Sequence, residues 1–259
     1  MKKWFFLFVA FPFILLTIGL FCMRPKGFCL SQISASHAPR SEWEVPMPPL
    51  PEEVFSQPYT YLKSGSQCWA FVSQDGKYVF KFFRMKHLIP KTWLNYIPLP
   101  YVLDRYRHEK IDKHQERLER VFGAYSQAFK QLKEETALEW IHLNSTKTVN
   151  KTLTVIDRLG REHAIPLDRV PFIIQKKAEL LSSKCSPEAC TAIIDLVRAR
   201  CQKGFVDLDG GVRNNYGFIG ERAVQIDIGR LVYDPSIREH FRQEAELQRV
   251  REKIVKFCY

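Results

Sequence analysis

The sequence has no Cys-x-x-Cys pair, and its seven cysteines lie scattered along the chain. Closely paired cysteines are what structural zinc sites and thiol redox motifs require, so neither is expected here. Cys185 and Cys190 are five residues apart, a spacing that makes a poor metal site. An odd number of cysteines gives no complete set of disulfides, and the sequence therefore predicts free thiols.

Acidic residues are in the minority. The chain carries 39 Lys and Arg residues against 28 Asp and Glu residues, a formal net charge of +11. Such an excess favours acidic partners, namely anionic lipid, nucleotide or nucleic acid. No recognised nucleic-acid-binding motif accompanies the charge, so nucleic acid is not an expected partner. A length of 259 residues allows one or two domains with a sizeable core.

One long stretch lacks charge altogether. Residues 4–22 form an apolar run with two basic residues on either side. This length suits one membrane-spanning helix, so residues 1–26 are expected to anchor a single-pass membrane protein. Ser34–Ala38 contains a small-x-small pattern that is compatible with late cleavage, but we favour an uncleaved anchor. The flanking charges are nearly balanced and leave the side of the membrane undecided.

Residues 27–57 are rich in proline and serine. This composition predicts a linker, partly in the polyproline II conformation, between the membrane and a folded domain. A ligand for SH3-type domains is the alternative interpretation of its Pro-rich centre.

Three strands are predicted at the start of the folded domain, and the third carries a lysine in an apolar setting. They are Tyr59–Leu62, Cys68–Val72 and Tyr78–Phe83. Lys81 shares its strand face with Val79 and Phe83, and a lysine on a buried face is costly unless an anion pairs with it. A lysine that extends from a sheet edge into water is the structural alternative.

The remaining pattern completes an α+β domain. A long helix with an apolar stripe is predicted from Asp104 to about Lys133, and helices from Ser186 to Gln202 and from Pro235 to Phe257 follow later. Between them, four segments predict further strands of an antiparallel sheet: Ala137–Leu143, Thr152–Asp157, Glu162–Pro166 and Phe172–Gln175.

The segment from Lys203 to Leu231 has the layout of a strand, a polar loop and a hairpin. It brings three oxygen-bearing side chains to one hairpin mouth: Asp209, Asn214 and Asp227. A calcium loop does not fit, because a glycine and a valine stand at its third ligand and obligatory glycine positions. An Asp- and Gly-rich surface turn is the simpler alternative.

The spacing of these residues resembles the protein-kinase-like superfamily. Asn214 follows Asp209 by five residues, and Asp227, in Asp-Ile-Gly, follows Asn214 by thirteen. In that superfamily a catalytic-loop Asp, an Asn and the Asp of an Asp-Phe-Gly motif occur in this order. The chain departs from the pattern because no His-Arg precedes Asp209, no Ala-Pro-Glu follows, and the glycine-rich loop keeps only Gly65.

The resemblance implies a two-lobe fold. Residues 58–178 would form the small lobe, with an antiparallel sheet and one long helix, and residues 179–259 a shortened helical large lobe. The function implied is the binding of ATP with magnesium and the transfer of a phosphoryl group to an unknown protein or small-molecule acceptor. A need for cytosolic ATP would place the domain on the cytoplasmic side of the membrane.

The same resemblance implies roles for individual residues. Asp209 would be the base, and Lys81 would contact phosphate. The remaining assignments are Asn214 and Asp227 as magnesium ligands, Gly65 in the phosphate loop and Glu119 as the partner of Lys81. Two other functions stay open: a pseudokinase-type scaffold that uses the same pocket, and a membrane-tethered structural protein with no nucleotide site.

Overall fold

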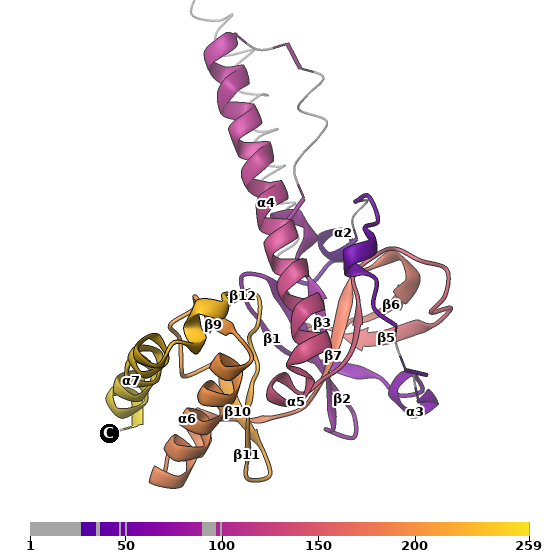
Figure 1. The fold of residues 1–259 in the computed structure, drawn as a ribbon. Helices are drawn as coiled ribbons and strands as arrows, with labels where there is room; N and C mark the ends of the chain where they lie inside the picture. Colours follow the sequence, from indigo (N-terminus) through magenta and orange to yellow (C-terminus); the bar gives the residue numbers. More distant parts are fainter. Residues whose placement is uncertain are drawn as a thin grey trace, which may run out of the picture.

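The computed structural model describes residues 27–34, 37–46, 48–49, 51–89, 97–98 and 100–258. They form an α+β fold with two parts, a large curled sheet beside a long helix and a smaller part built from two helices and two short sheets (Figure 1). The large sheet has the spatial order β4–β7–β3–β2–β1–β5–β6. Its strands are β1 (Tyr59–Ser64), β2 (Cys68–Ser73), β3 (Tyr78–Phe83), β4 (Leu138–His142), β5 (Thr152–Ile156), β6 (Glu162–Pro166) and β7 (Phe172–Lys176).

The turn between β2 and β3 shows why the predicted strands form. Asp75 Oδ1 accepts hydrogen bonds from Ser73 Oγ (2.6 Å) and from the N–H of Lys77 (3.0 Å). Gly76 adopts a φ of 71°, which glycine reaches without steric cost. The turn fixes the register, so that the apolar side chains of both strands enter the core. The three strands predicted at the start of the domain are confirmed.

The sheet differs from the prediction at one junction. β1 and β5 run parallel, with Tyr59 opposite Val155, whereas the other neighbouring strands are antiparallel. After β4 the chain passes to the far edge of the sheet and forms the β5–β6 hairpin beside β1, before returning as β7. The prediction of a purely antiparallel sheet is therefore wrong, and the sheet is mixed.

The segment expected to be a linker packs against the domain. Phe28, Ile33 and Val54 are buried in the core on one face of the sheet, and Trp43 is buried against the long helix. The described part of 27–57 therefore belongs to the folded unit and is not a free spacer. It contains α2 (Leu30–Ile33), η1 (Ser41–Trp43) and α3 (Glu52–Phe55).

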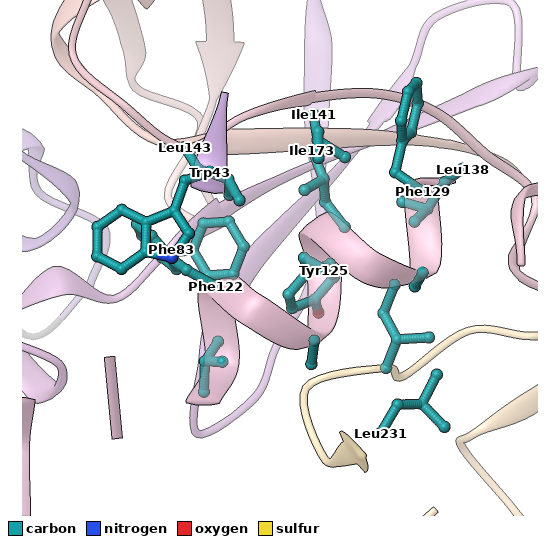
Figure 2. Packing of buried hydrophobic residues seen from close by; sticks show 14 of the residues in the cluster. Trp43, Phe83, Phe122, Tyr125, Phe129, Leu138, Ile141, Leu143, Ile173 and Leu231 are labelled. Carbon is teal, nitrogen blue, oxygen red and sulfur yellow. The ribbon is translucent and has the colours of Figure 1, made fainter. Parts of the chain in front are cut away.

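The long helix α4 (Tyr101–Gln131) and the short α5 (Lys133–Thr136) lie before β4. The second half of α4 packs on the sheet through Phe122, Tyr125 and Phe129, close to Ile141 and Ile173 (Figure 2). Its first half extends beyond the sheet (Figure 1). The predicted apolar stripe is therefore buried only from Leu118 onward. Between β3 and α4, the segment Met85–His87 forms η2, and Met85 is buried.

The smaller part is built on an antiparallel pair of helices, α6 (Pro187–Gln202) and α7 (His240–Cys258). Ser186 caps α6 as predicted, because its Oγ accepts a hydrogen bond from the N–H of Ala189 (3.1 Å). The helix predicted from Pro235 begins as a 3₁₀ turn and becomes α7 at His240. The other elements are η4 (Leu167–Arg169), β8 (Glu179–Leu180), η5 (Leu181–Ser183), β9 (Phe205–Asp207), β10 (Tyr216–Ile219), β11 (Arg222–Gln225), β12 (Leu231–Tyr233) and η6 (Pro235–Arg238).

A disulfide joins Cys185, before α6, to Cys258, at the end of α7. The expectation that the cysteines are all free thiols is wrong for this pair. Sequence spacing could not reveal the pair, because 73 residues separate the two cysteines and only the antiparallel packing of the helices brings them together. The sulfurs of Cys29, Cys68, Cys190 and Cys201 are free.

The expected transmembrane helix requires a correction. Across the described residues, no helix combines the length and the apolar character needed to cross a bilayer. The longest, α4, carries charged residues along most of its length. The predicted anchor at residues 4–22 lies outside the described residues. A transmembrane helix is therefore not part of the described fold, and the predicted single-pass membrane localisation is withdrawn with it.

Candidate functional site

The hairpin β10–β11 holds the loop that carries Asn214 and the segment that carries Asp227. The N–H of Ile226 donates a hydrogen bond to the carbonyl of Asn215 (2.6 Å), which closes the open end of the hairpin. Asp227 follows directly, and its Oδ1 accepts a hydrogen bond from the N–H of Gly229 (3.2 Å). The side chains of Asn214 and Asp227 therefore stand at one mouth, and both residues are exposed.

Lys81 reaches this mouth from the large sheet. Lys81 is only 7% exposed, and its Nζ donates a hydrogen bond to the carbonyl of Ile226 (2.8 Å). Burial lowers the pKa of Lys81 to about 8, and the nearby carboxylate of Asp227 opposes that shift. The contact spans 145 residues of sequence and ties the two parts of the fold together.

Lys81, Asn214 and Asp227 line one hollow of about 240 Å³, here called the inner hollow. The loop between β1 and β2 covers it and contributes Gly65. Tyr125 of α4 and Cys68 of β2 form part of its wall. The inner hollow thus gathers a cation, an amide and a carboxylate from three separate segments of the chain.

The side chain of Gln67 packs closely against Gly229. A Cβ at this position would collide with the side chain of Gln67 from the loop between β1 and β2. The buried Oε1 of Gln67 has no hydrogen-bond partner. The loop therefore rests on the Asp-Ile-Gly segment through a polar side chain that keeps a free acceptor.

An apolar slot of about 400 Å³ continues from the inner hollow and shares Lys81, Ala70 and Ile226 with it. Val79 from the sheet and Val224 from the hairpin also line the slot. The backbone that links β7 to β8, residues 176–179, closes its side. Flat apolar walls beside a strip of backbone suit an aromatic ring with polar edges.

Gln175 stands at the end of β7, lines the slot and is only 3% exposed. Its Nε2 donates a hydrogen bond to the carbonyl of Thr136 (2.8 Å), which fixes the orientation of the amide. Its buried Oε1 has no partner. An unpaired buried acceptor is costly, so the slot offers an acceptor for an N–H group. A glutamine ending an apolar strand was the sequence signal, and the sequence reasoning missed it.

Asp209 lies beside the inner hollow, in the loop after β9. Its N–H donates a hydrogen bond to Asp207 Oδ1 (2.8 Å), and its own Oδ1 accepts one from the N–H of Gly211 (3.1 Å). It lines a wide, shallow hollow that shares Asn214 with the inner hollow. Asp209 therefore does not line the inner hollow itself and is connected to it through Asn214, which lines both hollows.

Glu119 is placed elsewhere. It forms an ion pair with Arg40 and accepts a hydrogen bond from Gln115 Nε2 (2.9 Å), and it lines neither the inner hollow nor the slot. Tyr125, two turns further along α4, faces Lys81 across the inner hollow. Glu119 faces the N-terminal segment because that segment, which supplies Arg40, packs on α4.

A buried polar network beneath the loop was not foreseen. Arg200 is 1% exposed, forms an ion pair with Glu246 of α7 (2.7 Å) and donates a hydrogen bond to Gln225 Oε1 (2.9 Å). Gln225 Nε2 donates to Asp207 Oδ2 (2.8 Å). Burial raises the pKa of Asp207 to about 6, although Arg200 acts against the shift. The network fixes β9 and therefore the position of Asp209; an arginine among the apolar residues of α6 was its signal.

Nothing among the described residues brings three or more His, Cys, Asp or Glu side chains together as a metal site. Asn214 and Asp227 supply two oxygen donors, so a metal ion here would need ligand or water oxygens to complete its coordination. In comparisons with known proteins, no family model and no curated protein matches the chain.

Proposed function

We propose that this chain is a nucleotide-binding domain similar to the protein-kinase-like superfamily, which takes ATP with magnesium and transfers its terminal phosphoryl group. One observation carries the proposal. Lys81, Asn214 and Asp227 line one hollow that continues into an apolar slot of about 400 Å³. A cation with oxygen donors at one end and a flat apolar slot at the other match the two halves of a nucleotide.

The electrostatics of the inner hollow support the proposal. A buried lysine whose pKa is lowered to about 8 gains from an anion that restores its charged state. Phosphate oxygens near Lys81 would provide that anion. The amide oxygen of Asn214 and the carboxylate of Asp227 are the hard ligands that magnesium prefers, and the ion would neutralise charge that develops on the phosphates.

Asp209 is the proposed base, and it lines the neighbouring hollow that shares Asn214 with the inner hollow. An acceptor hydroxyl beside its carboxylate would attack the terminal phosphorus with an oxygen lone pair. The bond to the bridging oxygen would break, and its electron pair would leave with ADP. The hydroxyl proton would pass to the carboxylate of Asp209 and then to water, which balances the step as ADP plus a phosphorylated acceptor.

A scaffold without turnover is the second candidate, and Tyr125 favours it. Kinases hold their lysine with a glutamate from the helix, whereas Tyr125 takes the facing position here. Gln67, which belongs to the loop that would cover the phosphates, also packs against Gly229. Both features would lower catalytic power and still allow a ligand to bind.

Turnover separates the two candidates. ATP hydrolysis and autophosphorylation would be measured with the full-length protein and with Asp209→Asn, which keeps the size of the side chain and removes the proton acceptor. The enzyme proposal predicts a fall in turnover on the order of 10² to 10⁴ at unchanged ATP affinity. Asp195→Asn, an exposed aspartate on α6, is the matched control. Turnover that is equal in wild type and Asp209→Asn contradicts the role of Asp209 as a base.

A further inference from the structure

The wide hollow outside Asp209 has a distinct charge. We call it the basic mouth and define it by Asp209, Arg213, Lys253, Lys256 and Phe257, which line about 580 Å³ together with the backbone of the loop. Three of these five side chains are cationic, and Asp209 is the single carboxylate that lines it. The basic mouth shares Asn214 with the inner hollow, so its floor lies where an acceptor would meet the phosphoryl group.

The cations of the basic mouth are not paired with acids. Within the described part of the chain, no carboxylate forms an ion pair with Arg213, Lys253 or Lys256. On α7, the helix that carries Lys253 and Lys256, Arg242 and Arg249 each form an ion pair with a glutamate (3.2 and 2.7 Å). Unpaired cations gathered around one hollow produce a positive potential that attracts anions.

Contacts with the rest of the mouth place two of these three cations, Lys253 and Arg213. A Cβ at Gly210 would collide with Lys253 Nζ, so the glycine leaves room for the ammonium group against the loop. Arg249 Nη2 donates a hydrogen bond to the carbonyl of Asp207 (2.9 Å), which fastens α7 to the base of the same loop. The guanidinium of Arg213 lies over the ring of Phe257, 5.7 Å from its centre.

We propose that the basic mouth binds the anionic group of a small acceptor, a phosphate or carboxylate compound whose hydroxyl then faces Asp209. Lysine and arginine recognise both kinds of anion through charge-assisted hydrogen bonds. The volume of the basic mouth suits a small molecule. This inference rests on the proposed function, because it identifies the class of acceptor for the same transfer reaction.

The test uses three probes that share a pyranose ring: glucose 6-phosphate, glucuronate and glucose. Their dissociation constants for the full-length protein would be measured by ligand-observed NMR at low salt, without nucleotide. The inference predicts that both anions bind at least about tenfold more tightly than glucose, with the preference reduced at high salt. Equal binding of the three probes overturns it.

Variants locate the binding. Lys253→Gln combined with Lys256→Gln should weaken both anions by about tenfold or more, since two charged contacts are lost. The control is Arg251→Gln, which removes a charge from the opposite side of α7, where Arg251 lines a separate groove with α6. Equal affinities in the double variant and the control overturn the inference. Binding only of a glutamate-rich serine peptide, dependent on the two lysines, also overturns the small-molecule assignment.

Failure of the anion-site inference can be distinguished from failure of the proposed phosphoryl transfer. ATP binding would be measured on the same samples. If ATP binds and the anions do not, this inference alone is lost. If the anions bind through Lys253 and Lys256 and ATP does not, the phosphoryl-transfer proposal is lost and the basic mouth remains as an anion site.

Discussion

At the scale of single residues, Lys81 contributes to the change of the protein's stability with pH above neutrality. Its pKa is about 8 in the folded state and near 10.5 when unfolded, so the unfolded chain binds more protons between these values. Stability should therefore rise with pH across that window, because deprotonation removes the cost of a buried charge. A lysine kept buried at such a cost is better explained by a ligand than by packing.

Lys81→Met is predicted to stabilise the free protein at pH 7. The pKa shift of Lys81 corresponds to a destabilisation of about 3 kcal/mol by the buried charge, which methionine removes. Methionine also loses the hydrogen bond to Ile226, which destabilises the fold by about 1 kcal/mol, so the net stabilisation is about 2 kcal/mol. The gain should shrink between pH 8 and pH 10.5. Urea unfolding at pH 7 and pH 9.5 measures both values. A methionine variant that is less stable at pH 7 would show that Lys81 stabilises the fold.

Gln175 is predicted to select the base of a bound nucleotide. Its free Oε1 can accept a hydrogen bond from the exocyclic amine of adenine, whereas inosine presents a carbonyl there. Wild type should bind ATP about tenfold more tightly than inosine triphosphate, and Gln175→Leu should bring the two close to parity. Calorimetric titration of both nucleotides gives the ratio. A preference that survives in Gln175→Leu would assign base selection to the backbone of residues 176–179.

The sequence places residues near one another most directly where the geometry is local. Asn214 and Asp227 belong to one hairpin, so their spacing alone was enough to bring them together. The prediction of Glu119 as the partner of Lys81 is wrong, because its actual partner Arg40 comes from a segment whose composition resembled a linker. Gln67 and Tyr125 meet the site through contacts between distant elements, which periodicity does not report.

At the scale of elements, strand and helix positions followed from apolar alternation and turn residues. Two features did not. The parallel contact of β1 with β5 depends on a crossing of the sheet. The packing of residues 27–57 depends on a few aromatic and aliphatic side chains, such as Trp43, within a proline-rich composition. Those apolar residues were the sequence signal for packing, because a solvated linker contains few aromatic and aliphatic side chains.

The disulfide between the ends of α6 and α7 is predicted to stabilise the smaller part of the fold. It closes a loop of about 73 residues, for which chain entropy predicts about 4 kcal/mol. Cys258→Ser, or a reducing agent, should lower the free energy of unfolding by roughly 2–4 kcal/mol. Denaturant unfolding with and without reductant measures the change, and Cys190→Ser is the control because Cys190 is free. Equal losses in the two variants would contradict a stabilising role for the bond.

At the scale of the whole molecule, the site exists only where the two parts of the fold meet. Lys81 comes from the large sheet, Asn214 and Asp227 come from the smaller part, and the backbone of residues 176–179 connects them. A ligand that bridges the parts should therefore stabilise the fold as a whole. This coupling is the central claim, since Lys81 comes from one part and Asn214 and Asp227 come from the other.

Thermal unfolding of the full-length protein with ATP and magnesium tests this claim most directly. At one hundred times its dissociation constant, a ligand that binds only the folded state adds about 2.7 kcal/mol. The account predicts that ATP with magnesium raises the melting temperature, that Asp227→Asn abolishes the magnesium-dependent part, and that Asp195→Asn behaves as wild type. A melting temperature unmoved by saturating ATP and magnesium, together with no binding at equilibrium, would contradict the account.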